Sequence, residues 1–495
     1  MKNLLKAVWI LICLVAIGGC LTSVVLDDPK LFWTGSSPTS CDPLDYDAFT
    51  HHLIFKSIFS SLITQYKSGE YVGQVAESWI STPDLKHWTF KIRHNLKFEN
   101  NDSIDSTEII KSLTRIAYLQ KVNHSLSGLT EHLTGINLVK SPNTSFPGIR
   151  KVDSHTITLS FNKSMPKVLD AISFGLYSIS NSKDFNPTTG EWLNKKKCIS
   201  SGAYLISHWD DQMVKVKLRK DFLPELRHPK AMTSIQFIWD PKLKYSADII
   251  AGTSVENQPK VNGFEFKGSS PSYTYYASCQ SWPEKNGIFG TLEKRRGIRA
   301  FFYEELFKLG VSLTKSFFPL AILGVHEFVT LESKKDLFDA KGKVLRIPVS
   351  GNRNEVIVAL YKAVDNLSAH GLSVEKKEVP FSQQMIEANP HLKRFSADLS
   401  IRFTGILIED PKDDILFMFR SKEGIMLPDA DGRITRELKK ENFDVQKINE
   451  LLWDQAIIWP IMQFSYGLWV KPQYDFSIVN LVLPPTELQW IGFNN

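Results

Sequence analysis

The chain has 495 residues, of which 43% are apolar and 12% aromatic, and a chain of this length can bury the cores of about three ordinary domains. Lys and Arg number 59 and Asp and Glu number 53, giving a formal net charge of +6. The two signs are interspersed along the chain and form no basic block, so nucleic-acid binding is not indicated.

Residues 1–20 are typical of an export segment. A positively charged start precedes the apolar run Ala7–Ile17, which is too short to span a bilayer comfortably. The run ends in Gly18-Gly19-Cys20, which resembles a lipobox and implies that Cys20 becomes the lipid-modified N-terminus. An ordinary cleaved signal with an incidental cysteine is the alternative. The lipid reading predicts an extracytoplasmic protein, in the periplasm or at the cell surface, anchored to a membrane through its N-terminal lipid.

The five cysteines are Cys13, Cys20, Cys41, Cys198 and Cys279. Export removes the first and lipidation occupies the second, so at most one internal disulfide can form among the other three. These three are separated by more than 80 residues, which is unlike the spacing of a zinc site. The sequence leaves open which pair is bonded, and buried free thiols are an equal alternative.

Residues 76–93 predict two strands joined by a turn. Trp88, Phe90 and Ile92 alternate with polar residues, so one face of the second strand is apolar. Ser81-Thr82-Pro83-Asp84 carries turn chemistry, because proline presets φ and Asp84 can close the turn with its side chain.

A second turn and a helix follow these strands. Asn100-Asn101 predicts a tight turn, because asparagine tolerates positive φ. Asp105 or Ser106 then caps a helix. The apolar positions that share one helix face are Ile109, Ile110, Leu113, Ile116 and Ala117.

The order of these residues resembles a known family. They resemble the signature of the extracytoplasmic solute-binding proteins of family 5, which serve peptide and nickel ABC transporters. The residues that carry the resemblance are Val75-Ala76-Glu77-Ser78-Trp79, then Trp88-Thr89-Phe90-Lys91-Ile92-Arg93, Phe98 and Glu108-Ile109. Asn101 stands where the family usually has glycine, a replacement that a positive-φ turn can accept. Ile457–Lys471 resembles the family's return strand.

The resemblance implies a mixed α/β fold of two lobes, a type II, cluster C-like periplasmic-binding-protein clamshell with an additional subdomain in the first lobe. The chain itself predicts a partly parallel α/β unit, with strands at 342–349 and 373–379 around a helix at 354–370. The implied domains are the signal peptide at 1–20, a discontinuous first lobe at 21–53, 190–270 and 472–495, the extra subdomain at 54–189, and the second lobe at 271–471.

The resemblance also places candidate ligand residues. The segment after Asp42-Pro43 runs along the ligand cleft in the family, which implies Tyr46, Asp47 and Phe49 here; a core role is the alternative for the two aromatic residues. From the second lobe, Thr404 and Leu407 are implied, with Gln463 and Phe464 opposite on the return strand.

Leu407 falls where oligopeptide-binding members place an aspartate that pairs with the free amino group of the peptide, and Thr404 falls where they place a tryptophan. A buried ammonium without a carboxylate partner costs several kcal/mol. Peptide capture therefore requires that the alignment shift onto Glu409 or Asp410. A non-peptide ligand such as a nickel chelate stays open.

The function that the resemblance implies is a monomeric solute receptor that binds a small solute, most plausibly an oligopeptide, and delivers it to an ABC permease in the membrane. The chain has no GxxxxGK[ST], HExxH or GxSxG motif, so neither the ATPase nor an enzyme of these classes is indicated, and no cofactor or metal is expected. The side chains of adjacent His51 and His52 diverge, which predicts a solvated helix start. The helix itself is expected at 53–64. The alternative function is a lipid-anchored surface protein that has lost transport and serves adhesion or sensing.

Overall fold

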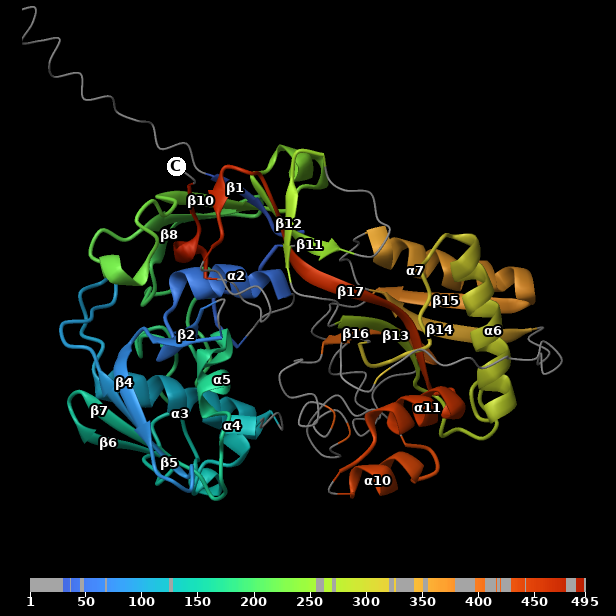
Figure 1. The fold of residues 1–495 in the computed structure, drawn as a ribbon, viewed down its shortest axis with the longest axis horizontal. Coiled ribbons are helices and arrows are strands. Elements are labelled where there is room, and N and C mark those ends of the chain that lie inside the picture. The colour runs from blue at the N-terminus through green and yellow to red at the C-terminus, as the bar shows by residue number, and fades with distance from the viewer. Residues whose placement is uncertain are drawn as a thin grey trace, which may run out of the picture.

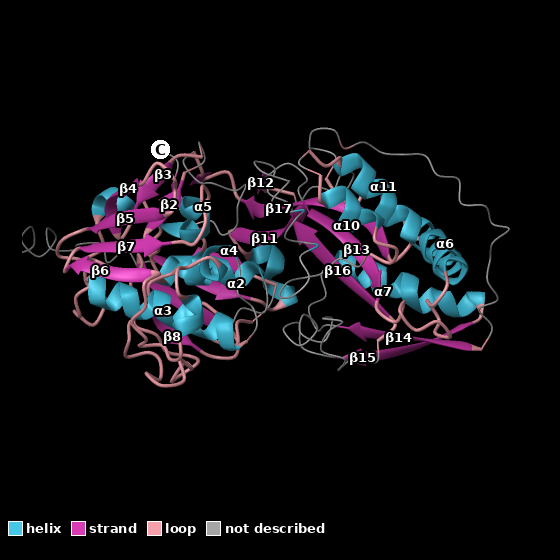
Figure 2. Ribbon diagram, turned by 90° about the horizontal axis from the view of Figure 1, so that it is seen from below, coloured by secondary structure: helices cyan, strands magenta, loops and turns pink. Residues whose placement is uncertain are grey.

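The chain forms two units that lie side by side, and strand β17 runs from one into the other (Figure 1). The view from below in Figure 2 shows the same division. The computed structural model describes residues 30–35, 37–44, 49–66, 69–123, 128–254, 262–268, 273–319, 325, 342–349, 355–378, 397–405, 415, 419, 429–440, 442–477 and 487–493.

One sheet joins the two units. Its order is β16-β13-β17-β11-β1-β10-β9-β8, and β12 also pairs with β17. β17 (Ile458–Val470) pairs near its start with β13 (Tyr273–Cys279) and near its end with β11 (Ile249–Ser254) and β12 (Glu265–Gly268). The return strand expected at 457–471 is therefore confirmed.

The first unit is built on the other half of this sheet. β1 (Lys30–Trp33) runs parallel to β10 (Ser234–Ile238) and β11, whereas β9 (Met213–Leu218) and β8 (Tyr204–Trp209) are antiparallel. Its apolar core also includes helix α2 (Phe49–Ile58) and residues of the C-terminal segment. The short elements of this unit are η3 (Pro224–Leu226), η4 (Pro241–Ser246), β18 (Tyr474–Asp475), η8 (Leu488–Trp490) and β19 (Gly492–Phe493).

Helix α2 differs from its prediction in length and in environment. It ends at Ile58 instead of residue 64, and the chain continues into β2 (Ile63–Gln65). His51 and His52 are buried, so the expectation of a solvated helix start is wrong. The ring of His52 lies 5.1 Å from that of Phe174, between centroids, and burial lowers the pKa of His52 to about 3. The helix is enclosed on this side because the extra subdomain packs against it.

The extra subdomain contains the signature residues. β4 (Ala76–Ser81), β5 (His87–Ile92), β7 (Thr156–Ser160) and β6 (Ile149–Asp153) form an antiparallel sheet in that order, and α3 (Ser106–Val122) shares its core. The shorter elements are β3 (Tyr71–Gly73), α4 (Gly128–Glu131), η1 (Ile136–Leu138), α5 (Val168–Ser173) and η2 (Gly175–Tyr177).

The local predictions for the signature segment are confirmed. Asp84 Oδ1 accepts hydrogen bonds from the Lys86 amide (3.1 Å) and the Thr82 hydroxyl (2.6 Å), which closes the first turn. Asn101 has φ +66°, as a left-handed turn position requires. The Asp105 side chain accepts from two backbone amides at the start of α3 and is its N-cap.

The second unit also contains a β-α-β element, whose two strands form a sheet of their own. β14 (Lys343–Val349) and β15 (Leu372–Glu378) are parallel, and α7 (Glu355–Asn366) with η6 (Leu367–His370) connects them, as the sequence predicts. β16 (Leu399–Gly405) lies at the edge of the main sheet beside β13. The helices α6 (Leu292–Lys308) and α7 share one core with this sheet, and α11 (Val445–Gln455) shares another; α10 (Arg433–Leu438) precedes α11.

The cores give a physical division of the chain. The first unit draws its core from residues 32–59, 203–251 and 468–491, the subdomain from 62–179, and the second unit from 275–464. Residues 54–59, which the domain prediction assigned to the subdomain, belong to the first of these cores. The exact domain boundaries stay a prediction.

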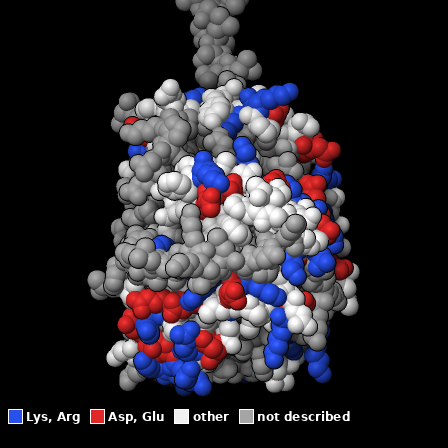
Figure 3. Space-filling view, turned by 90° about the vertical axis from the view of Figure 1, so that its right-hand side faces the viewer, with Lys and Arg blue, Asp and Glu red and all other residues white. Residues whose placement is uncertain are grey.

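Two surface properties complete the description. On the face of the second unit in Figure 3, basic and acidic side chains are intermingled, in agreement with their spacing in the sequence. Within the described part of the chain, no helix combines the length and the apolar character needed to cross a membrane.

Candidate functional site

Four of the eight residues predicted from the sequence as ligand or lipid sites lie outside the described residues. These are Cys20, Tyr46, Asp47 and Leu407. Phe49 begins α2, but the placement of its side chain is also outside the description. The roles assigned to these five residues stay predictions.

The other three predicted residues come together on neighbouring strands. Thr404 of β16 pairs with Thr274 of β13, and Thr274 pairs in turn with Gln463 of β17. Phe464, the next residue of β17, pairs with Tyr273. The three strands therefore place the backbone of these positions side by side at one end of the sheet. The side chain of Thr404 lies outside the description, and the ligand roles stay predictions.

The two faces of these strands have different chemistry. Phe464 is 1% exposed and stacks on Tyr275 and Tyr273, with ring centroids 4.4 and 5.4 Å apart, in the core shared with α6 and α7. This face is apolar and fully packed. The ligand contact predicted for Phe464 stays a prediction, and its observed role is to stabilise the core.

The opposite face carries polar side chains. Residues paired across antiparallel strands point to the same side of the sheet, so Gln463 and Thr274 share a face with Tyr276, two residues farther along β13. Gln463 Nε2 donates to the carbonyl of Phe318 at 2.9 Å. The Thr274 hydroxyl is buried and has no hydrogen-bond partner among the residues that the structure describes. Such an unpaired buried group costs about 1–3 kcal/mol, so it needs an explanation.

Arg402 is the residue of this face that the sequence analysis missed. It pairs with Tyr276 in the register of β16 and β13, and its guanidinium donates a hydrogen bond to the Tyr276 hydroxyl. Its Nη2 atom is enclosed, and no group in the described part of the chain accepts a hydrogen bond from it. We use the name polar row for Thr274, Tyr276, Arg402 and Gln463.

The electrostatics of the polar row favour an anion. Burial lowers the pKa of Arg402 from its usual range, and the bond to Tyr276 opposes this shift. An arginine keeps its positive charge at neutral pH even so. Among the described residues no carboxylate forms an ion pair with Arg402. A buried guanidinium with a free N–H is well suited to bind a carboxylate, which its planar fork can engage with two hydrogen bonds.

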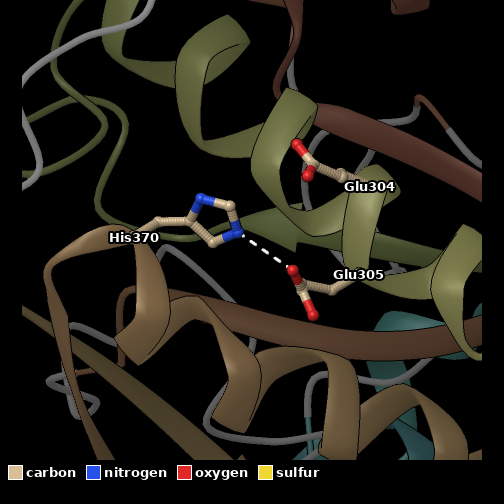
Figure 4. Close-up of side chains that lie close together, drawn as sticks. All are labelled: Glu304, Glu305 and His370. Atoms are coloured by element: carbon tan, nitrogen blue, oxygen red, sulfur yellow. Dashed lines mark hydrogen bonds and ion pairs between the residues drawn. The ribbon is translucent and has the colours of Figure 1, made fainter.

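A second cluster has residue types that can hold a metal. Among the described residues, Glu304 and Glu305 of α6 and His370 of η6 place one possible ligand atom each within 4.8 Å of one another. Figure 4 shows His370 pointing at Glu305, with 3.0 Å between Nε2 and Oε1. Lys308 Nζ lies 3.0 Å from Glu304 and 2.7 Å from Glu305, so an ammonium already neutralises both carboxylates.

The same contacts explain the acidity of Glu305. Hydrogen bonds from Lys308 and then from His370 lower its pKa to about 2. Asn366 at the end of α7 also donates to it, at 2.9 Å. The cluster therefore joins α6 to the end of α7, and we assign it a structural role.

Part of this chain is similar in sequence to a known protein family. Residues 70–251 match the bacterial extracellular solute-binding proteins, family 5 Middle. This matched segment is about a third of the chain, which resembles family-5 solute-binding proteins there. The family model describes solute-binding proteins, and the match agrees with the recognition made from the signature segment.

The curated relatives of this chain are distant. The periplasmic murein peptide-binding protein MppA of Escherichia coli is 24% identical over 176 residues, which are 34% of this chain and 32% of MppA. The periplasmic oligopeptide-binding protein OppA of Salmonella typhimurium is 23% identical over 179 residues, 35% of this chain and 33% of OppA. The sequence matches therefore span about a third of the length of these relatives.

Solved structures match over almost the whole chain. The murein tripeptide binding protein MppA of Escherichia coli superposes with a TM-score of 0.70 at 15% identity, covering 94% of this chain and 99% of MppA. DppA of Helicobacter pylori, in complex with the peptide STSA, gives 0.69 at 14% identity, covering 94% and 98%. These likenesses confirm the predicted mixed α/β fold of the periplasmic binding proteins.

One further comparison concerns how the two units are arranged. An unliganded open form of MppA superposes with a TM-score of only 0.55, although identity and coverage of this chain are again 15% and 94%. The arrangement of the two units in this chain is thus closer to that of the first MppA structure than to that of the open one.

Proposed function

We propose that this chain is an extracytoplasmic receptor that binds an oligopeptide between its two units and delivers it to an ABC permease. Support comes from the family-5 match and from a full-length fold shared with proteins whose names state that they bind murein peptides, oligopeptides or dipeptides. The difference between the two MppA comparisons supports a hinge between the units, which closure around a ligand requires.

The observation that supports the ligand class is a pair of polar groups in the polar row that have no partner among the described residues. Arg402 Nη2 and the Thr274 hydroxyl both lack partners among the groups around them, and they lie on neighbouring strands beside Gln463 and Thr404. A carboxylate of the ligand would accept from both groups. We therefore propose that Arg402 binds a carboxylate of the peptide, at its C-terminus or on an acidic side chain.

The opposite end of a peptide carries an ammonium, and Leu407 supplies no charge for it. Asp47, proposed from the first unit, and Glu409 or Asp410, after a shift of the alignment, are the carboxylates that would pair with it. Tyr46, Phe49 and Leu407 would then contact apolar parts of the ligand. These positions are proposals from the family resemblance.

We further propose that Cys20 carries the lipid that holds the receptor on the outer side of a membrane, as a monomer beside its permease. The lipobox-like end of the export segment supports this. The mass of the exported protein tests it, because a diacylglycerol-modified Cys20 adds the mass of the lipid and Cys20→Ser abolishes the addition.

The ligand class is tested by thermal unfolding of the purified protein with added peptides. Tripeptides with a free C-terminal carboxylate should raise the melting temperature, because a ligand present at about 100 times its Kd adds roughly 2.7 kcal/mol of stability. The same peptides with an amidated C-terminus and no acidic side chain should raise it much less.

Two other outcomes would replace the proposal. Stabilisation by nickel chelates but by no peptide would retain the transport function and change the ligand class. No stabilisation by either would favour the lipid-anchored surface protein without transport.

A further inference from the structure

Two of the three cysteines in the described residues lie together, although 157 positions separate Cys41 from Cys198. Cys41 is fully buried in the core of the first unit, and Cys198 packs against the same core. The structure records both as free thiols. Cys279, the third, lies in the core of the second unit, with Sγ 3.7 Å from the carbonyl oxygen of Ala456.

The backbone holds the two cysteine segments against each other. The Cys41 amide donates to the carbonyl of Lys195 at 2.7 Å, and its Sγ lies 3.9 Å from the carbonyl oxygen of Asn194. The turn that leads to Cys198 is closed by the Lys197 amide, which donates to the Asn194 carbonyl at 3.1 Å. Cys198 is thus fixed by a short turn whose preceding residues already pair with Cys41.

The thiol groups themselves are in contact, since the Cys198 and Cys41 side chains form a hydrogen bond. A disulfide requires that the two Cβ atoms already approach and point toward each other. The contact between the two thiols meets the first of these conditions, because it brings the ends of both side chains together.

We propose that Cys41 and Cys198 form a disulfide in the exported protein. The proposal rests on the proposed function only for the oxidising compartment. The oxidant is a disulfide-containing molecule: one cysteine thiolate attacks it and releases one thiol, and the second cysteine attacks the mixed disulfide and releases the other. Two thiols thus lose two protons and two electrons, and the oxidant becomes two thiols.

The buried environment decides when the bond forms. The contact with Cys41 and burial both raise the pKa of the Cys198 thiol well above its usual range, so thiolate is scarce once the protein has folded. Oxidation therefore accompanies folding, before the pair is covered.

The bond would fix the start of the predicted ligand segment. Asp42 follows Cys41 and pairs with Arg115, whose guanidinium lies 5.1 and 5.0 Å from the ring centroids of Phe185 and Trp192. The chain then enters residues 45–49, which contain the first-unit ligand positions proposed from the resemblance. A covalent link at residue 41 would hold this segment in place when the two units move.

The test is peptide mapping of the full chain after alkylation under denaturing conditions. The chain is taken from the exported pool and, separately, refolded from the reduced state with glutathione disulfide. We expect a peptide pair that joins Cys41 to Cys198, with Cys279 alkylated before reduction and all three alkylated after it. The refolding arm does not depend on the compartment, so it separates this inference from the proposed function.

Stability gives a second readout. A reductant should lower the melting temperature of the oxidised protein by roughly 5–10 °C, because the bond closes a long loop. Cys279→Ala should retain this shift, and the double variant Cys41→Ala, Cys198→Ala should lose it. Alkylation of Cys41 and Cys198 before reduction in both preparations, or a link that includes Cys279, would overturn the inference.

Discussion

Tyr276 and Arg402 face each other across β13 and β16, and the guanidinium donates to the buried phenol while its Nη2 atom has no partner among the described residues. A protein that evolved only for stability would pair or solvate this charge. The arrangement is instead typical of a group kept ready for a ligand.

Arg402→Gln should weaken the binding of peptides with a free carboxylate by about 10- to 100-fold, because hydrogen bonds to a charged group contribute about 1.5–3 kcal/mol. Isothermal titration calorimetry measures the change. Binding of the amidated peptide should change little, since it lacks the group that Arg402 is proposed to hold.

Arg150→Gln is the matched control, because Arg150 is exposed on β6 of the extra subdomain. It should bind both peptides as the unaltered protein does. Equal losses for the free and amidated peptides in Arg402→Gln would indicate a structural effect and contradict the carboxylate assignment.

Lys56 and Glu487 form a buried ion pair of 2.6 Å that joins α2 to the C-terminal segment, with side chains 2% and 3% exposed. Lys56→Met should lower the free energy of unfolding by about 3–5 kcal/mol, because it leaves the Glu487 carboxylate buried without its cation. Urea unfolding measures this. Lys91→Met removes the exposed pair with Glu77 and should cost less than about 1 kcal/mol; similar losses in the two variants would refute the distinction.

The stability of the protein should depend on pH because Asp184 titrates differently in the folded and unfolded states. Burial raises its pKa to about 7, although its carboxylate accepts from the Ile199 amide at 2.9 Å. The folded state therefore holds a proton that the unfolded state releases near its ordinary pKa of 3.8, so stability falls as the pH rises from about 4 to about 7, by at most about 4 kcal/mol.

Asp184→Asn removes this contribution while keeping an oxygen for the Ile199 amide. Chemical denaturation at several pH values should show a flatter profile between pH 4 and 7 than in the unaltered protein. Parallel profiles for the two proteins would show that Asp184 does not titrate in this window.

Substitutions at Asn101 test the turn in the signature segment. Its φ of +66° costs an ordinary residue about 1–2 kcal/mol, and asparagine or glycine much less. Asn101→Ala should therefore lower the free energy of unfolding by about 1 kcal/mol, and Asn101→Gly, the residue usual in the family, should leave it nearly unchanged. Thermal unfolding would contradict this if the glycine variant were the less stable of the two.

Local chemistry made much of the fold predictable. Alternation at Trp88, Phe90 and Ile92 placed a half-buried strand, and Asp105 marked the start of α3, because both signals act within a few residues. The order of the signature residues then supplied the two-unit architecture. Periodicity alone does not give the path of β17 through both units.

The burial of residues by distant segments, and the pairing between such segments, could not be predicted from the sequence. His51 and His52 read as solvated because nothing nearby in the chain shows that the subdomain covers α2. Arg402 was missed because its role depends on Tyr276 and Thr274, which are more than 120 positions away. It also depends on the lack of a partner for its Nη2 atom among the described residues. The same holds for Cys41 and Cys198, whose contact only the folded chain shows.

The most direct measurement of the central claim is native mass spectrometry of the gently purified exported protein, followed by fragmentation of whatever it releases. The proposed function predicts a released mass of a few hundred daltons that fragments as a peptide with a free carboxylate. A released metal chelate or another non-peptide solute would contradict the ligand class. No released ligand, together with no binding of added peptides, would contradict the receptor function itself.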